Sequence, residues 1–162
     1  MTRLTVLICT HNRSELLQRV LASINEAVRP PQCAVELLVV ANACTDDTVN
    51  VLRRYESESK SSGALPLRWT EEPKPGKSNA LNRAIPMISA GLVCFIDDDH
   101  RVDRTYFVNL AKAAERYPRV TMFCGRILPD WDGTEPRWVH DTGPYRIYPL
   151  PEIGRASWRA RV

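Results

Sequence analysis

Apolar runs alternate with amphipathic stretches along the chain up to about residue 124. The runs at residues 4–9, 35–40, 67–70, 92–96 and 120–124 have the length and composition of β-strands. Between them, apolar positions recur three and four residues apart, which is typical of amphipathic helices. Alternating strands and helices predict a parallel, three-layer α/β sheet. The run at 92–96 is almost wholly apolar, so we expect a central strand covered on both faces.

Polar residues near these runs predict where the helices begin and end. Asn12 is followed three residues later by a glutamate, which is the pattern of a capping box. Thr45 and Ser78 are the predicted N-caps of the next two helices. The serine-rich residues 57–63 predict a linker, and residues 104–117 predict a further helix. Beyond residue 125 prolines interrupt every run, and we predict no regular element there.

The composition is that of a soluble globular protein. The chain has 162 residues, of which 44% are hydrophobic and 25% charged, and this length suits one domain. The content of Leu, Val and Ile excludes global disorder. No apolar run approaches the roughly 18 residues needed to span a membrane. The net charge of +3 is too small to indicate a nucleic-acid partner.

The cysteines indicate a reducing compartment. There are five, an odd number, and none forms the C-x-x-C spacing of a zinc or redox site. The N-terminus also lacks the longer apolar core and cleavage site of a signal peptide. We therefore expect free thiols in a cytoplasmic protein.

Three consecutive carboxylates, Asp97, Asp98 and Asp99, come directly after the run at 92–96. Neighbouring carboxylates repel each other by about 1 kcal/mol at about 4 Å in water, and by more in a cleft. A divalent cation would remove this repulsion, and oxygen ligands suit Mg²⁺ or Mn²⁺. Ligands bind at the carboxyl ends of strands in open α/β sheets, where this run is expected. The alternative is an acidic loop that only caps the next helix.

Two further segments place polar residues beside a predicted helix start. Residues 10–13 follow the first strand, in a position suited to a nucleotide, although a simple turn with a cap would also explain them. Lys77 precedes the third helix within a Gly-Lys-Ser sequence that imitates the end of a P-loop. The glycine that a P-loop requires five positions earlier is replaced by Glu71, so that motif is excluded. What remains is a lysine suited to phosphate charge, or an exposed, solvated one.

Four segments together resemble one known family. Residues 7–13, 39–48, 77–82 and 97–99 occur in the order and spacing of the family 2 glycosyltransferases, and the resemblance covers roughly residues 4–128. It implies the GT-A fold, a Rossmann-like α/β/α sandwich with a mainly parallel sheet. It also implies transfer of a sugar, with inversion, from a nucleotide diphosphate donor to a saccharide or lipid-linked acceptor, with Mg²⁺ or Mn²⁺ as cofactor.

The resemblance implies roles for single residues. Thr10 and His11 would line the pocket for uracil or another base, and Asn42 would contact that base. Asp98 would reach the ribose, and Asp99 would bind the metal that bridges the diphosphate. The donor-binding residues implied in this way are Thr10, His11, Asn12, Arg13, Asn42, Lys77, Asp97 and Asp98, with Asp99 as the metal ligand.

Two positions depart from the family pattern. His11 replaces a tyrosine or phenylalanine that is more usual in the family, which would alter stacking on the base. Ala41 stands where many members have an aspartate, so one polar contact to the nucleoside is missing. These departures leave the identity of the base open.

No general base is identifiable. The acceptor hydroxyl must lose a proton to a positioned group, usually a carboxylate. In the family this carboxylate lies beyond the acidic run, in an acidic pair ahead of a helix, and no such segment occurs here. Asp130, Asp132 and Asp141 lie in proline-rich sequence, so we assign no catalytic residue. The alternative function is therefore a non-catalytic module that binds nucleotide sugars.

Members of the family are generally longer than this chain, so we expect an N-terminal fragment. Residues 1–128 would form the nucleotide-sugar-binding domain, and residues 129–162 would begin the acceptor region. Residues 152–162 resemble translated adapter or vector sequence rather than native protein. We expect a cytoplasmic role in cell-envelope polysaccharide synthesis. Any association with the inner face of the membrane would come from regions outside this chain.

Overall fold

The computed structural model describes residues 2–125 and 127. The chain divides into two units, Met1–Ala111 and Lys112–Val162, and the sheet and the candidate site lie in the first. The predicted domain boundary at residue 128 stays a prediction. Asp130, Asp132 and Asp141 lie outside the described residues, as does the predicted segment 129–162.

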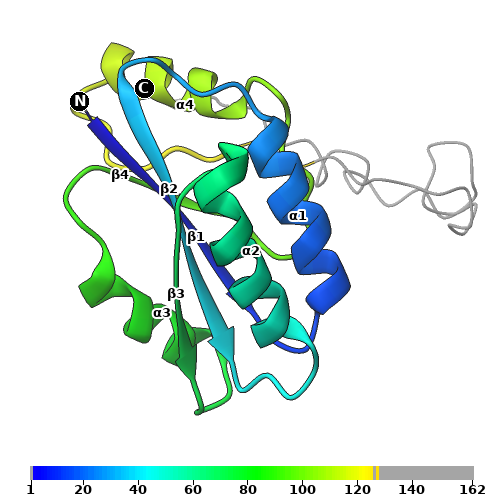
Figure 1. Cartoon of the computed structure of the whole chain (residues 1–162). Helices are drawn as coiled ribbons and strands as arrows, with labels where there is room; N and C mark the ends of the chain where they lie inside the picture. Colours follow the sequence, from blue (N-terminus) through cyan, green and yellow to red (C-terminus); the bar gives the residue numbers. More distant parts are fainter. Residues whose placement is uncertain (1, 126, 128–162) are drawn as a thin grey trace, which may run out of the picture. The chain divides into compact units, whose positions relative to one another are not determined.

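Four parallel strands form the sheet, in the order β3-β2-β1-β4 (Figure 1). The strands β1 and β2 pair along their length, from Thr2 with Cys33 to Thr10 with Ala41. The predicted parallel α/β sheet is confirmed. The bounds of the strands are β1 (Thr2–Thr10), β2 (Cys33–Asn42), β3 (Leu67–Glu72) and β4 (Leu92–Phe95).

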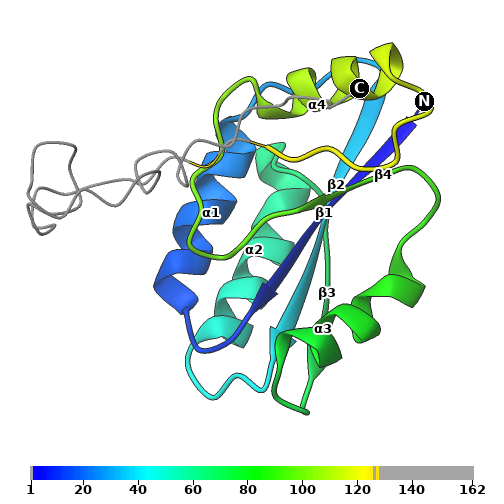
Figure 2. The ribbon, with the colours of Figure 1, turned by 180° about the vertical axis from the view of Figure 1, so that it is seen from behind.

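Helices cover both faces of the sheet. Figures 1 and 2 show α1 and α2 together on one face and α3 on the other. Parallel crossovers are right-handed, so the return from β3 to β4 places α3 opposite α1 and α2. Among residues 2–125 and 127, no helix combines the length and apolar character needed to cross a bilayer. The helices are α1 (Ser14–Glu26), α2 (Thr48–Ser62), α3 (Lys77–Ala84), the short 3₁₀ helix η1 (Ile85–Met87) and α4 (Tyr106–Arg116).

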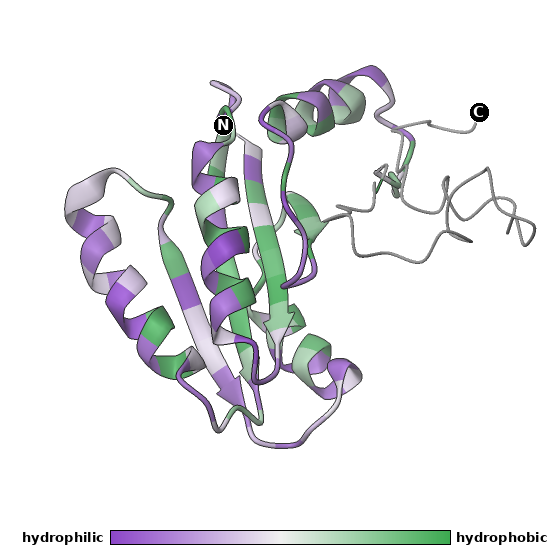
Figure 3. Ribbon diagram, turned by 90° about the vertical axis from the view of Figure 1, so that its right-hand side faces the viewer, coloured by the Kyte–Doolittle hydropathy of each residue, from purple (hydrophilic) through white to green (hydrophobic). Residues whose placement is uncertain are grey.

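Side chains of the central strands alternate between two buried layers. Leu4, Val6 and Ile8 of β1 are fully buried and point to one face. The intervening residues point to the face that α3 covers, and Figure 3 shows hydrophobic colouring along most of β1. The buried cluster on the α3 face consists of Leu7, Leu38, Val40, Ala80 and Ala84.

The strand order reverses direction at β1. From β1 the chain proceeds outward to β2 and β3, and it then returns to place β4 on the other side of β1. Ligands in open α/β sheets bind outside the carboxyl ends of the strands at such a reversal. The fold therefore places residues after Thr10 and after Phe95 at the position where a ligand is expected.

Two strand predictions are wrong, namely the strand at 120–124 and the central position of the run at 92–96. Residues 120–124 form no strand. Within residues 2–125 and 127, β4 is an edge strand, and the Phe95 side chain is 65% exposed. An apolar run alone cannot distinguish a central strand from an edge strand, because both bury at least one face.

Hydrogen bonds join the loops after β1 and β2, and they show that two predicted helix caps, Asn12 and Thr45, are wrong. Asn12 does not cap α1, because its Oδ1 accepts hydrogen bonds from the backbone N–H of Thr45 (2.7 Å) and Asp46 (3.3 Å) in the other loop. Asp46 in turn accepts from the N–H of Ser14 (3.0 Å) and Thr48 (3.1 Å). The Asp46 carboxylate thus accepts a hydrogen bond from the first residue of both α1 and α2. The N-cap of α2 is Asp47 and not Thr45.

The prediction of a linker at residues 57–63 is wrong, because residues 57–62 are the last part of α2 and Gly63 follows its end. Its serines remain compatible with a helix because the hydroxyls of Ser57, Ser59 and Ser61 each donate to the carbonyl three residues earlier. The helix ends where Gly63 adopts a left-handed conformation with φ 71°. The prediction of Ser78 as a cap is also wrong, since α3 already begins at Lys77.

Candidate functional site

The carboxyl ends of β1, β2 and β4 and the start of α3 surround an open cavity of about 320 Å³. Apart from Asn12, all the predicted donor-binding residues and the predicted metal ligand line this cavity. They come from segments far apart in the sequence, which meet because the strands are parallel. The lining residues are Cys9, Thr10, His11, Arg13, Asn42, Lys77, Asp97, Asp98 and Asp99.

The acidic run forms a tight turn after β4. The backbone N–H of His100 donates to the carbonyl of Asp97 (3.2 Å), which closes a turn with Asp98 and Asp99 at its centre. The Asp98 side chain is only 7% exposed, whereas those of Asp97 and Asp99 are 50% and 49% exposed. The turn therefore anchors one carboxylate and leaves two accessible.

Arg13 joins two of these carboxylates. Its Nη1 donates to Asp98 Oδ1 (3.0 Å) and to Asp99 Oδ2 (3.2 Å). The hydrogen bond and the charge of Asp98, with a smaller contribution from Asp99, raise the pKa of the Arg13 guanidinium. Arg13 is the residue directly before α1, so the β1–α1 turn brings this cation to the acidic turn.

Lys77 pairs with the remaining carboxylate. It is the first residue of α3, and its Nζ donates to Asp97 Oδ1. The hydrogen bond from this ammonium to Asp97 raises the pKa of Lys77. Among the described residues that line the cavity, two cations thus face three carboxylates.

Asn42 holds the loop that leads to Lys77. This residue is 4% exposed, and its Nδ2 donates to the carbonyls of Glu72 (3.0 Å) and Lys74 (2.7 Å). Its Oδ1 accepts from the N–H of Gly76 (2.8 Å). Its backbone carbonyl lies 2.7 Å from His11 Nδ1. Both N–H groups of the Asn42 amide are therefore used by the protein itself.

Thr10 and Cys9, at the end of β1, bring a hydroxyl and a thiol to the cavity. Thr10 is 2% exposed, and its Oγ1 is buried without a hydrogen-bond partner in the described part of the chain. The neighbouring Cys9 is half-buried, and burial raises the pKa of its thiol despite the opposing charge of Lys77. Cys9 thus lines the cavity as a neutral thiol, and the orphaned Thr10 hydroxyl is a group that a polar ligand could satisfy.

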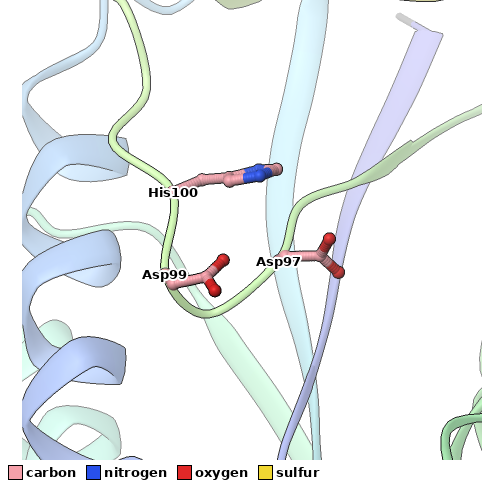
Figure 4. A group of neighbouring side chains, drawn as sticks. All are labelled: Asp97, Asp99 and His100. Atoms are coloured by element: carbon pink, nitrogen blue, oxygen red, sulfur yellow. The ribbon is translucent and has the colours of Figure 1, made fainter. Parts of the chain in front are cut away.

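His100 is a candidate site residue that the sequence analysis missed. Ligand atoms of Asp97, Asp99 and His100 lie within 4.8 Å of one another (Figure 4). Two carboxylates and an imidazole form a chemically suitable donor set for a divalent cation. The signal available in the sequence was the position of this histidine directly after the acidic run.

A family model described as Glycosyl transferase family 2 matches residues 5–160. The chain belongs to this family. Among curated proteins no sequence matches the chain.

Solved structures of glycosyltransferases share the fold of this family 2 chain. A mannosyltransferase from Pyrobaculum calidifontis, PcManGT, in complex with GDP-Man and Mn²⁺, is 29% identical, with a TM-score of 0.62 over 78% of this chain and 35% of that one. S. aureus TarS 1–349 in complex with UDP-GlcNAc is 20% identical, with a TM-score of 0.59 over 78% of this chain and 33% of that one. The chain thus spans about a third of either relative and has the GT-A architecture.

Proposed function

We propose that the cavity binds a nucleoside diphosphate sugar, as the donor site of a glycosyltransferase that transfers the sugar to an acceptor hydroxyl. The observation that carries this proposal is the convergence of the four motif segments on one cavity at the strand reversal. The complexes of PcManGT with GDP-Man and of TarS with UDP-GlcNAc support a ligand of this class. A location in the cytoplasm and a role in cell-envelope polysaccharide synthesis stay predictions.

The cations of the site are suited to the diphosphate. Arg13 and Lys77 each lie next to a helix start, where backbone N–H groups also favour anions. Their side chains are 49% and 63% exposed, so both can turn from the carboxylates toward phosphate oxygens. Negative charge grows on the diphosphate as the bond to the sugar breaks, and fixed cations stabilise that charge.

The residues of the acidic turn fit a divalent cation. Asp97, Asp99 and His100 would hold it, with Mg²⁺ and Mn²⁺ as the candidates. When bound, such an ion supplies Lewis-acid stabilisation of the leaving diphosphate. Asp98 uses one oxygen for Arg13, and we assign its other oxygen to the ribose.

The base pocket is assigned to the end of β1. Thr10 and His11 line it, and the buried Thr10 hydroxyl has a free hydrogen-bonding capacity. We assign Asn42 to the support of the loop before α3 instead of a side-chain contact with the base, because both of its amide N–H groups bond to that loop.

The experiment is isothermal titration calorimetry of the full chain with UDP and GDP, with and without Mn²⁺. Asp99→Ala is expected to weaken metal-dependent nucleotide binding by roughly tenfold or more. Asp47→Ala is the matched control, because Asp47 is an exposed carboxylate that does not line the cavity. Unchanged affinity of Asp99→Ala in the presence of Mn²⁺ would contradict the metal role, and absence of binding by the unmodified chain would contradict the proposal.

The second candidate is a module that binds nucleotide sugars without transferring them. It is favoured because we assign the three carboxylates that line the cavity to the metal and the ribose, which leaves none of them as the general base. Donor hydrolysis with Mn²⁺ distinguishes the two functions. Turnover by the full-length protein supports the transferase, whereas binding without turnover supports the module.

A further inference from the structure

The ring of His100 faces the acidic turn without a partner of its own. Its backbone N–H closes the turn with Asp97, but no side-chain hydrogen bond of His100 occurs among residues 2–125 and 127. The residue is partly buried, and Figure 4 shows its ring on the same turn as the carboxylates of Asp97 and Asp99. His100 is not among the residues that line the cavity, but its ligand atom lies within 4.8 Å of those of Asp97 and Asp99, which do line it, so its nitrogen lone pair is available to a cation shared with them.

Within the part of the chain that the structure describes, Asp97 and Asp99 each keep one carboxylate oxygen without a hydrogen bond. Asp97 uses Oδ1 for Lys77, and Asp99 uses Oδ2 for Arg13. Ligands at about 2.0–2.2 Å from a cation lie at most about 4.4 Å apart. The observed separations within 4.8 Å thus need only a small side-chain rotation to meet this limit.

We propose that His100 is a direct ligand of the divalent cation, and that its imidazole makes the site select Mn²⁺ or another transition ion over Mg²⁺. This inference rests on the proposed function. Imidazole suits transition ions, whereas Mg²⁺ prefers oxygen ligands and water. The histidine that ends the acidic turn would therefore decide which metal the enzyme uses.

The test uses electron spin-echo envelope modulation of Mn²⁺ bound to the full chain, which detects a directly coordinated ¹⁴N nucleus. The chain has three histidines, His11, His100 and His140, so single Gln variants of each assign the signal. His100→Gln is expected to remove the ¹⁴N modulation, and His11→Gln and His140→Gln to retain it. In calorimetry, His100→Gln should weaken Mn²⁺ roughly tenfold or more and Mg²⁺ less than about twofold.

A second variant replaces the nitrogen ligand with an oxygen ligand. His100→Asp supplies an oxygen ligand, so its preference for Mn²⁺ over Mg²⁺ is expected to fall below that of the unmodified chain. Circular dichroism establishes that both variants retain the fold. The quantity compared is the ratio of the Mn²⁺ affinity to the Mg²⁺ affinity. A general loss of structure would weaken the binding of both ions and would not lower this ratio selectively.

The results separate the two proposals. Mn²⁺ binding without ¹⁴N modulation, or modulation that survives His100→Gln, overturns the role of His100 and leaves the donor site standing. Absence of both metal and nucleotide binding in the unmodified chain overturns the proposed function and this inference with it. Loss of the modulation in His100→Gln alone supports direct coordination.

Discussion

The loop before α3 depends on one buried side chain, and Asn42→Ala tests this dependence. The substitution removes three hydrogen bonds, to the backbone of Glu72, Lys74 and Gly76. The Glu72 carbonyl keeps its bond from the N–H of Ala43 (2.7 Å), so two backbone groups lose their partner. These groups lie in an exposed loop, where water can replace part of what is lost.

The expected loss of stability follows from these contacts. A hydrogen bond contributes a net stabilisation of about 1 kcal/mol, so Asn42→Ala should lower the free energy of unfolding by roughly 2–3 kcal/mol. In urea, where small proteins have m-values of about 1–3 kcal/mol/M, this corresponds to a midpoint shift of about 0.7–3 M. Because the loop carries Lys77 into the cavity, nucleotide affinity should fall as well.

Urea denaturation followed by circular dichroism measures the effect. Asn82→Ala is the matched control, because Asn82 is exposed on α3 and makes no side-chain hydrogen bond within the described part of the chain. Asn42→Asp gives a second signature. Its carboxylate would face the carbonyls of Glu72 and Lys74, so its deficit in stability should widen as rising pH ionises it. A loss below about 0.5 kcal/mol for Asn42→Ala, equal to that of a neutral surface change, would refute the argument.

Three further outcomes are expected. Asp46→Ala should cost about 1–2 kcal/mol in urea denaturation, as for a lost N-cap. Burial raises the pKa of Asp46, but hydrogen bonds from Thr48 and Ser14 outweigh this effect, so its pKa in the folded protein is lowered. The stability that Asp46 contributes is therefore present above pH 3.8 and is lost as the pH falls through the folded pKa. Arg13→Ala should lower the urea midpoint, with partial recovery in Arg13→Lys, because it leaves the nearly buried Asp98 without its cation. Burial raises the pKa of Cys94 to about 11, so peptide mapping after alkylation at pH 8 should find the exposed Cys124 modified and Cys94 protected.

The part of the fold that the sequence predicted is the part set by local patterns. Apolar runs located all four strands, since a buried strand needs consecutive or alternating apolar residues. The meeting of Thr10, Lys77 and Asp97 in one cavity also followed, because parallel strands place their carboxyl ends at one edge of the sheet. Knowledge of which strand ends carry polar residues was therefore enough to locate the cavity, and its use as a donor site stays a prediction.

Long-range hydrogen bonds could not be predicted in this way. From their positions in the sequence, Asn12 is expected to cap a helix and Asn42 to contact a ligand. In the structure, each side chain instead accepts a hydrogen bond from a loop more than 30 positions away. An amide has the same chemistry whether its partner is a neighbour, a ligand or a distant backbone group, so the pattern alone leaves these uses open. The missing strand at residues 120–124 has a similar cause, since a short apolar run gives no information on its pairing partner.

The cavity combines a backbone that buried hydrogen bonds hold with charged side chains that are exposed. The bonds of the buried Asn42 together contribute a few kcal/mol and fix the backbone of the loop. The pair between Lys77 and Asp97 is half-exposed, and such pairs contribute only about 0–1 kcal/mol. The phosphate and metal that we propose as ligands would therefore replace this pair at little cost while the backbone that carries Lys77 stays in place. A donor site needs this division, because its charged side chains must change partners each time a ligand binds, whereas their positions in the fold must not change.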